Sequence, residues 1–245
     1  MTEPTSTKPT PGGPRAALDV AFVASAAVAT AWNDLSPGHA AVAVKLAPMA
    51  ILIARLARAL RSGEVEPRMG TALLFGLAAS TIGDVVLPYR FVGGLGAFLV
   101  AHLAYLVAMG RPQDRASSHA LAAAPALVVW AAMAWILVGG QRVPRPLLGP
   151  VVVYMTVICA MLARALGRAL VDVRSPASRV FAAGAAVFVA SDALIALSRW
   201  VVAIPHPRVA VLVTYYLAQR LLFAGVEAPG LAPAERRRRR RRAAW

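Results

Sequence analysis

Long apolar runs separated by short polar or proline-containing segments make up most of this chain. A helix that crosses the hydrocarbon core of a bilayer needs roughly 20 mostly apolar residues, and runs of about that length occur eight times. They predict membrane-spanning helices at about 16–32, 40–60, 69–88, 91–110, 118–139, 147–170, 178–201 and 207–226. The predicted fold class is therefore an all-α integral membrane protein with eight transmembrane helices.

The segments outside these runs are too short for a second folded domain. Residues 1–15 are rich in Pro, Thr and Gly and are expected to form a disordered tail, whereas residues 227–245 form a basic tail. The domain at 16–226 holds the eight helices. A competing interpretation takes residues 16–31 as a cleaved signal peptide, since Arg15, an apolar stretch and an Ala-Thr-Ala triplet follow one another. Cleavage would leave seven spans.

Composition and charge agree with a bilayer as solvent. The chain is 59% hydrophobic and 15% charged, with a net charge of +15. Such an excess could indicate a nucleic-acid partner in a soluble protein, but here 20 basic residues collect on one side of the predicted spans and 5 on the other. By the positive-inside rule, both termini are expected to be cytoplasmic. The sequence thus predicts a multi-pass protein of the cell membrane and no nucleic-acid partner.

The last tail carries an arginine run at 236–242. Clustered basic residues beside a membrane attract anionic lipids, so this run is expected to bind them at the cytoplasmic surface. It is equally interpretable as an anchor that fixes the orientation of the last helix.

A weak internal repeat links the two halves of the chain. A glycine precedes an aspartate by eight positions in the third span, at Gly76 and Asp84, and again in the seventh, at Gly184 and Asp192. The offset of four helices indicates a possible parallel 4+4 repeat.

Four ionisable residues lie well inside the predicted spans: Lys45, Asp84, His102 and Asp192. An ionisable side chain in a span costs about 2.5–3.5 kcal/mol on the insertion scale, which makes each a candidate for function. At 1.5 Å of rise per residue, Asp84 and Asp192 both lie about 9–10 Å from the outer boundary. They are expected to meet in one polar cavity with Lys45 and with Tyr105, Tyr154, Tyr215, Tyr216 and Gln219.

Structural interpretations remain open for these residues. Asp84 and Asp192 can each pair locally, with Lys45 and an interfacial group respectively, and only fix helix register. A lone histidine such as His102 is often a hydrogen-bonded packing residue, and the tyrosines can be packing or interfacial aromatics. Asp19 is expected to be solvated at the interface, and most arginines are expected to reach it from span ends.

Several segments together resemble the YhhN/TMEM86 family of eight-span membrane proteins, from about residue 40 to 224. They are VKLAP at 44–48, LFGLAASTIGD at 74–84, FVGGLGAFLVAHLAY at 91–105, YM at 154–155, VFAAGAAVFVASD at 180–192 and YLAQ at 216–219. The best-characterised members of that family are lysoplasmalogenases, which hydrolyse the vinyl ether bond of lysoplasmalogens to a fatty aldehyde and a glycerophospho-base.

The resemblance implies a site and a substrate class. It implies that Asp84 and Asp192 are catalytic and that the substrate is a lysophospholipid; the cleavage of a vinyl ether itself needs neither a metal nor another cofactor. It assigns binding or supporting positions to Lys45, His102, Tyr105, Tyr154, Tyr216 and Gln219.

The residue types fit this chemistry independently. A vinyl ether is cleaved when a proton adds to its β-carbon, water captures the resulting oxocarbenium ion, and the hemiacetal collapses. One carboxyl must then be protonated, which burial favours, and the other must stay ionised, which Lys45 favours if it lies beside it. The sequence does not say which aspartate takes which part.

Two other classes of function are compatible with an intramembrane cluster. A zinc-dependent membrane amidase needs several histidines within spans, and only His102 lies in one. A proton-coupled transporter would use the two aspartates as protonation sites and the repeat as its alternating halves.

Overall fold

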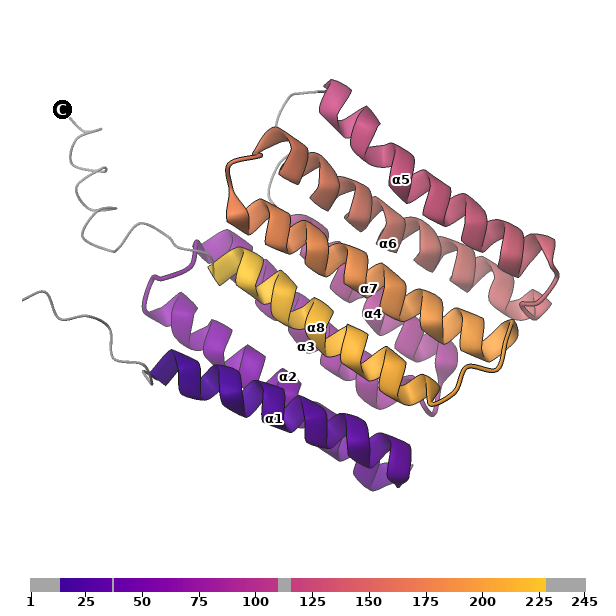
Figure 1. The fold of residues 1–245 in the computed structure, drawn as a ribbon, viewed down its shortest axis with the longest axis horizontal. Coiled ribbons are helices and arrows are strands. Elements are labelled where there is room, and N and C mark those ends of the chain that lie inside the picture. The colour runs from indigo at the N-terminus through magenta and orange to yellow at the C-terminus, as the bar shows by residue number, and fades with distance from the viewer. Residues whose placement is uncertain (1–13, 37, 110–115, 228–245) are drawn as a thin grey trace, which may run out of the picture.

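The computed structural model describes residues 14–36, 38–109 and 116–227 (Figure 1). In these ranges it contains eight α-helices, with a short π-helical turn, η1, continuing the fifth, and each helix is long and apolar enough to cross a membrane. The predicted fold class is confirmed. The helices are α1 (Pro14–Leu35), α2 (His39–Arg61), α3 (Pro67–Val86), α4 (Phe91–Ala108), α5 (Ala116–Ala134), η1 (Trp135–Gly139), α6 (Arg145–Val171), α7 (Pro176–Trp200) and α8 (Pro207–Glu227).

Local sequence signals fix the ends of several helices. The Glu66 side chain accepts hydrogen bonds from the first backbone N–H groups of α3, and Pro67 opens that helix. Ser175 and Pro176 form the same kind of start for α7. Pro48, which could break α2, lies buried inside a continuous helix. Membrane helices tolerate an internal proline when neighbouring groups in the bundle compensate for the lost backbone hydrogen bond.

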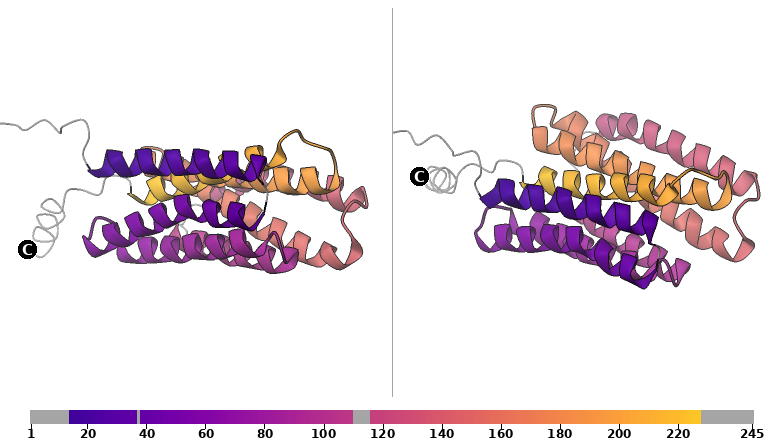
Figure 2. Two further views of the ribbon diagram at one scale, coloured as in Figure 1. Left: turned by 90° about the horizontal axis from the view of Figure 1, so that it is seen from below. Right: turned by 60° about the horizontal axis from the view of Figure 1, so that its bottom comes forward.

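Helices adjacent in the chain pack as antiparallel neighbours, with the exception of α4 and α5, and all eight helices of the described chain lie roughly along one axis (Figures 1 and 2). Seven of them close a ring in the order α1, α2, α3, α4, α6, α7 and α8, with α8 packing back on α1. α8 also contacts α2 and α3, which brings its buried face to the middle of the bundle. α5 lies outside the ring, chiefly against α6. The residues that α3, α4, α6, α7 and α8 bury therefore share one interior.

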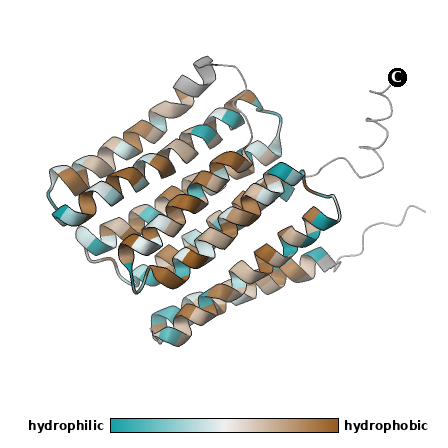
Figure 3. Cartoon of the chain, turned by 180° about the vertical axis from the view of Figure 1, so that it is seen from behind, coloured by the Kyte–Doolittle hydropathy of each residue, from teal (hydrophilic) through white to brown (hydrophobic). Residues whose placement is uncertain are grey.

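The outer surface suits a hydrocarbon solvent. Large apolar side chains are exposed around the bundle, among them Val20, Phe75, Ile82, Leu127 and Val153. Hydrophilic residues gather toward the helix ends (Figure 3). Such a continuous apolar exterior would be an aggregation hazard in water and is the expected surface of a protein in a bilayer.

Glycines allow two pairs of helices to approach closely. A Cβ added at Gly184 of α7 would lie 2.8 Å from the backbone nitrogen of Leu222 in α8, and one at Gly225 would lie 2.9 Å from the backbone of Phe181. A Cβ at Gly76 of α3 would lie 2.2 Å from the Tyr105 ring of α4. The two glycines of the predicted repeat therefore each face the next helix in the chain. The repeat itself remains a prediction.

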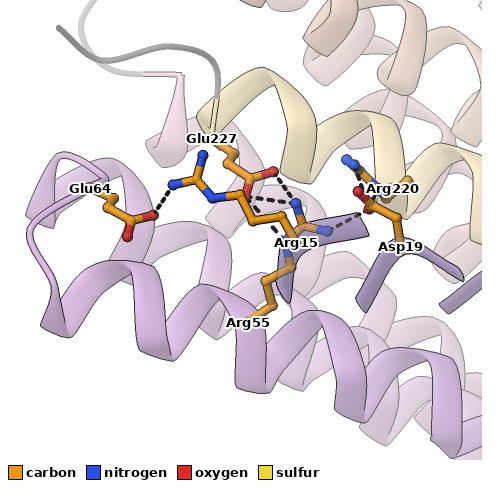
Figure 4. Close-up of polar contacts among 6 residues, drawn as sticks. All are labelled: Arg15, Asp19, Arg55, Glu64, Arg220 and Glu227. Carbon is orange, nitrogen blue, oxygen red and sulfur yellow. Dashed lines mark hydrogen bonds and ion pairs between the residues drawn. The ribbon is translucent and has the colours of Figure 1, made fainter. Parts of the chain in front are cut away.

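An ion-pair network joins α1, α2 and α8 at the end of the bundle where the described chain begins and finishes (Figure 4). The guanidinium of Arg55, 7% exposed, donates to Asp19 at 2.5 Å and to both oxygens of Glu227 at 2.8 Å. Arg220 donates to the same Asp19 oxygen at 2.8 Å. At the rim, Arg15 pairs with Glu64 at 2.7 Å.

This network corrects two sequence-based expectations. Asp19 is not merely solvated at an interface, because it accepts hydrogen bonds from two arginines. Arg55 is not a side chain extended toward the interface but a buried one, since two carboxylates from other helices neutralise it. The tails predicted at 1–15 and 227–245 lie outside the described residues, apart from Pro14, Arg15 and Glu227, and the orientation across the membrane stays a prediction.

Candidate active site

Asp84 is a buried carboxylate held by an ammonium group and a phenol. It lies near the end of α3 and is 4% exposed. Lys45 of α2 places its Nζ 3.4 Å from Asp84 Oδ1 and also 3.4 Å from the Asp84 backbone oxygen. Tyr215 of α8 donates its hydroxyl hydrogen to Oδ2 at 2.6 Å. Both carboxylate oxygens thus have partners, one of them a cation.

Asp192 of α7 ends a chain of three hydrogen-bonding groups. Tyr154 of α6 donates its hydroxyl to Asp192 Oδ2, and His102 of α4 places Nε2 2.8 Å from the Tyr154 oxygen. Since Tyr154 gives its hydrogen to the carboxylate, its oxygen accepts from His102 Nε2–H. His102 is completely buried, and its Nδ1 has no hydrogen-bond partner in the described part of the chain.

A third set of hydrogen-bonded side chains, all uncharged, joins α3, α4 and α8. Tyr105 of α4 donates to Gln219 Oε1 of α8 at 2.8 Å and lies 3.0 Å from the Ser80 hydroxyl of α3, which donates to it. The ring of Tyr105 fits against α3 because residue 76 is glycine. These contacts tie three helices together at the level of the carboxylates.

Phe188 of α7 lies at the centre of the cluster. Its ring centroid is 4.7 Å from that of His102, 6.2 Å from Tyr105 and 5.7 Å from Tyr215. The polar groups are therefore arranged around an aromatic ring in separate hydrogen-bonded sets. That the two aspartates share a single polar cavity remains a prediction.

The structure brings most of the predicted site residues into contact, with two differences. The Lys45–Asp84 pair matches the local-pairing interpretation, but the partners of Asp192 are Tyr154 and His102 rather than an interfacial group. Among the described residues, the Tyr216 hydroxyl donates to the Lys45 backbone oxygen alone, at 3.1 Å, so it supports α2 rather than either carboxylate.

Two residues of the cluster were not identified from the sequence. Ser80 lies one helical turn before Asp84 on the same face of α3, a spacing that could have identified it. Phe188 lies four residues before Asp192 in an apolar background, where no local signal distinguishes it. Within the described ranges, no three His, Cys, Asp or Glu side chains are grouped to hold a metal ion.

An apolar pocket reaches Asp192 from the side of the bundle covered by α5. Residues of α4, α5, α6 and α7 line it, and its only carboxyl and hydroxyl groups are those of Asp192 and Tyr154. Oδ2 of Asp192 is occupied by Tyr154, and Oδ1 has no hydrogen-bond partner within the described chain. An apolar chain in this pocket would thus lie beside a carboxyl oxygen that has no hydrogen-bond partner within the described chain. The apolar lining includes Leu95, Phe98, Met133, Leu137, Met155 and Trp200.

Comparison with known proteins gives consistent matches. The model of the YhhN family matches residues 40–226. Lysoplasmalogenase TMEM86B of Sus scrofa is 30% identical over 203 residues, which make up 82% of this chain and 81% of that protein. The protein of the same name from Homo sapiens is 30% identical over 155 residues, 62% of either chain. A lysoplasmalogenase of Mycobacterium tuberculosis (strain CDC 1551 / Oshkosh) is 32% identical over 193 residues, 73% of this chain and 67% of that protein. No solved structure matches this chain.

Proposed function

The chain belongs to the YhhN family, and on this basis we propose that it is a membrane-embedded hydrolase of lysolipids that cleaves the vinyl ether bond of lysoplasmalogens. The products would be a fatty aldehyde and a glycerophospho-base. The observation that carries this proposal is the carboxyl group of Asp192 on the wall of an apolar pocket. The names of the relatives, which are lysoplasmalogenases at 30–32% identity, support the substrate class.

In the proposed reaction, Asp192 protonates the substrate. The alkyl chain lies in the apolar pocket, and Oδ1 of Asp192 delivers a proton to the β-carbon of the vinyl ether. The carbon–carbon π electrons form the new C–H bond, which leaves an oxocarbenium ion whose charge is shared with the ether oxygen. Water adds to that carbon and gives one proton to the Asp192 carboxylate, which restores the acid, and the hemiacetal collapses to aldehyde and alcohol.

The partners of Asp192 prepare it for this step. Tyr154 fixes the carboxyl through Oδ2 and leaves the other oxygen toward the pocket. His102 lies behind Tyr154, with Nε2 2.8 Å from the Tyr154 oxygen, and donates to it, which orients the Tyr154 hydroxyl toward Asp192. Asp192 is the group that touches substrate, and the other two position it.

Asp84 supplies the second charge. It pairs with Lys45 and accepts a hydrogen bond from Tyr215, and in its ionised form it would stabilise the oxocarbenium ion from the other side of the Phe188 ring. Asp84→Asn and Asp192→Asn are each expected to lower turnover about 10²–10⁴-fold, the usual contribution of general acid–base groups, with insertion into the membrane retained.

One experiment separates the hydrolase from the transporter that uses the same aspartates. Purified protein in detergent is incubated with a lysoplasmalogen, and the aldehyde is measured; the saturated ether lipid is the matched control substrate. Aldehyde from the first alone, lost in Asp192→Asn, supports the hydrolase. No aldehyde, together with proton-dependent lipid flux in proteoliposomes, would identify a transporter.

Isotope labels test the reaction path. In D₂O, protonation at the β-carbon places one deuterium on C2 of the aldehyde and slows the reaction. Cleavage on the glycerol side would release an enol that also gains deuterium, so the oxygen label is decisive. In H₂¹⁸O, the glycerophospho-base should carry no ¹⁸O, and ¹⁸O in that product would refute the mechanism.

We also propose that the protein lies in the cell membrane with both termini in the cytoplasm and that the arginine run at 236–242 binds anionic lipid there. The 20-to-5 distribution of basic residues supports this orientation. The site then lies toward the non-cytoplasmic side, because Asp84 is close to the end of α3 remote from the termini.

A further inference from the structure

A second, larger pocket opens at the end of the bundle opposite to the termini. Its volume is about 650 Å³, and its walls are the first turns of α2, α4 and α8, the last turn of α7 and the turn between α3 and α4. The mechanism proposed above does not use it. Its lining differs from that of the apolar pocket in charge.

The second pocket is lined by basic and not by acidic residues. Lys45, Arg199, Arg208 and His39 line it, and no Asp or Glu does. Lys45 is half-buried and paired with Asp84, whereas Arg199 and Arg208 are exposed at the mouth. Neither arginine forms an ion pair within the described part of the chain. Arg199 and Arg208 therefore bring to the pocket positive charge that no carboxylate of the described residues pairs with.

Aromatic rings, rather than a carboxylate, position one of these arginines. The Arg199 guanidinium lies over the Phe91 ring, 4.6 Å from its centroid, and 5.7 Å from that of Trp200. Stacking fixes the plane of a guanidinium and leaves its N–H groups available, which suits recognition of a phosphate.

The N-termini of three helices add to the positive electrostatic potential of this pocket. α2, α4 and α8 begin at the wall of this pocket, at His39, Phe91 and Pro207. No side chain caps the first N–H groups of α2 or α4. The positive ends of helix dipoles favour an anion at such a place.

The two pockets share part of their walls. Leu87, Phe91 and Ile195 line both of them. A molecule whose alkyl chain lies beside Asp192 would therefore place a polar group a few atoms away into the basic pocket. From this arrangement we propose that the pocket binds the phosphate of the lysolipid headgroup, with Arg199 and Arg208 as its charged contacts. The proposal rests on the proposed function for the identity of the lipid.

Binding of non-hydrolysable lipids tests this site independently of catalysis. The full-length protein in detergent is titrated by calorimetry with 1-O-hexadecyl-glycero-3-phosphoethanolamine and with 1-O-hexadecylglycerol, which lacks the phosphate. We expect the phospholipid to bind more tightly. Arg199→Gln and Arg208→Gln should each raise its Kd about fivefold, the effect expected for one charge near the membrane surface, and should leave the Kd of 1-O-hexadecylglycerol unchanged.

Matched variants distinguish the effect of a lost charge from the effect of a disturbed fold. Arg145→Gln removes an arginine at the same end of the bundle that does not line the pocket, and it should change neither Kd. Arg199→Lys and Arg208→Lys keep the charge and should restore most of the affinity. Equal Kd values for the two lipids in the unaltered protein, or a parallel loss for both in the glutamine variants, would overturn the proposal.

Inorganic phosphate and turnover complete the test. Competition of inorganic phosphate with the phospholipid supports a shared phosphate site, whereas arginine-dependent phosphate binding without competition would show a site for the free ion and overturn the headgroup assignment. Lysoplasmalogen turnover is measured separately. Phosphate-dependent lipid binding without turnover would refute the hydrolase and support the phosphate site. Turnover without phosphate-dependent binding would support the hydrolase and overturn the phosphate site.

Discussion

Replacing Tyr154 with phenylalanine removes one hydroxyl at the junction between His102 and Asp192. The ring, whose centroid lies 5.3 Å from that of His102, stays to fill its place. The hydroxyl accepts from His102 and donates to Asp192, so the variant breaks two hydrogen bonds and leaves the apolar pocket almost unchanged. If Asp192 is the proton donor, the loss should appear in turnover more than in substrate binding.

The size of the effect follows from the geometry. A hydrogen bond to a charged group contributes about 1.5–3 kcal/mol, which corresponds to a rate factor of about 10–150. His102 Nε2 is 3.6 Å from Asp192 Oδ2, close enough to replace part of the lost bond after a small movement. We therefore expect kcat to fall about tenfold, at the low end of the range. The double variant Tyr154→Phe/His102→Phe, which cannot make the replacement bond, should lose about 100-fold or more.

Tyr105→Phe is the matched control. It removes an equally buried hydroxyl whose partners, Ser80 and Gln219, are uncharged, so it should lower thermal stability but alter kcat little. The assay is aldehyde release from a lysoplasmalogen across a range of substrate concentrations, with thermal unfolding in detergent measured alongside. Full turnover in Tyr154→Phe, or an equal loss in Tyr105→Phe, would refute the part assigned to the Tyr154 hydroxyl.

Four further predictions concern stability, packing, orientation and the basic tail. Arg55→Met should lower the free energy of unfolding in detergent by about 3 kcal/mol, since it leaves the partly buried Glu227 without an ion pair in the described chain; Arg55→Met/Glu227→Gln should recover part of that loss in thermal unfolding. Gly184→Leu should separate α7 from α8 and lower the yield of folded protein by size-exclusion chromatography, whereas Gly149→Ala, with nothing within 4 Å of the added Cβ, should not. A reporter fused to the C-terminus should be active in the cytoplasm, and a periplasmic or extracellular signal would contradict the orientation. Deleting 236–242 should weaken binding to anionic but not to neutral liposomes.

The span pattern could be predicted from the sequence because it depends on local properties. Hydropathy and the length of a bilayer crossing determine the number of helices, and the expected bounds agree with the structure to within a few residues at most ends. The similar depth of the two aspartates in the membrane could be predicted by counting residues along the helices. The Lys45–Asp84 contact was one of two interpretations, since both residues lay at a similar depth.

Which helix lies beside which could not be predicted, because depth gives no direction around the bundle. His102 and Tyr154 are 52 residues apart and meet only because α4 packs on α6, with α5 displaced outward. The network of Arg55, Asp19 and Glu227 depends in the same way on α8 returning to α1 and α2. The separation of the two carboxylates by Phe188 depends on side-chain packing, for which hydropathy has no signal.

The outer position of α5 separates one wall of the apolar pocket from the helices that carry the hydrogen-bonded site residues. The apolar pocket measures about 80 Å³, well below the roughly 300–1,000 Å³ typical of sites for comparable ligands, so a long alkyl chain can enter only if a wall moves. Val129 and Met133 of α5 form part of that wall, on a helix that packs chiefly on α6 and contributes nothing to the hydrogen-bonded sets around Phe188. Under the proposed function, substitutions on α5 can therefore change which alkyl chain lengths are accepted, and how fast they enter from the bilayer, without altering Asp192, Tyr154, His102 or the ion pairs.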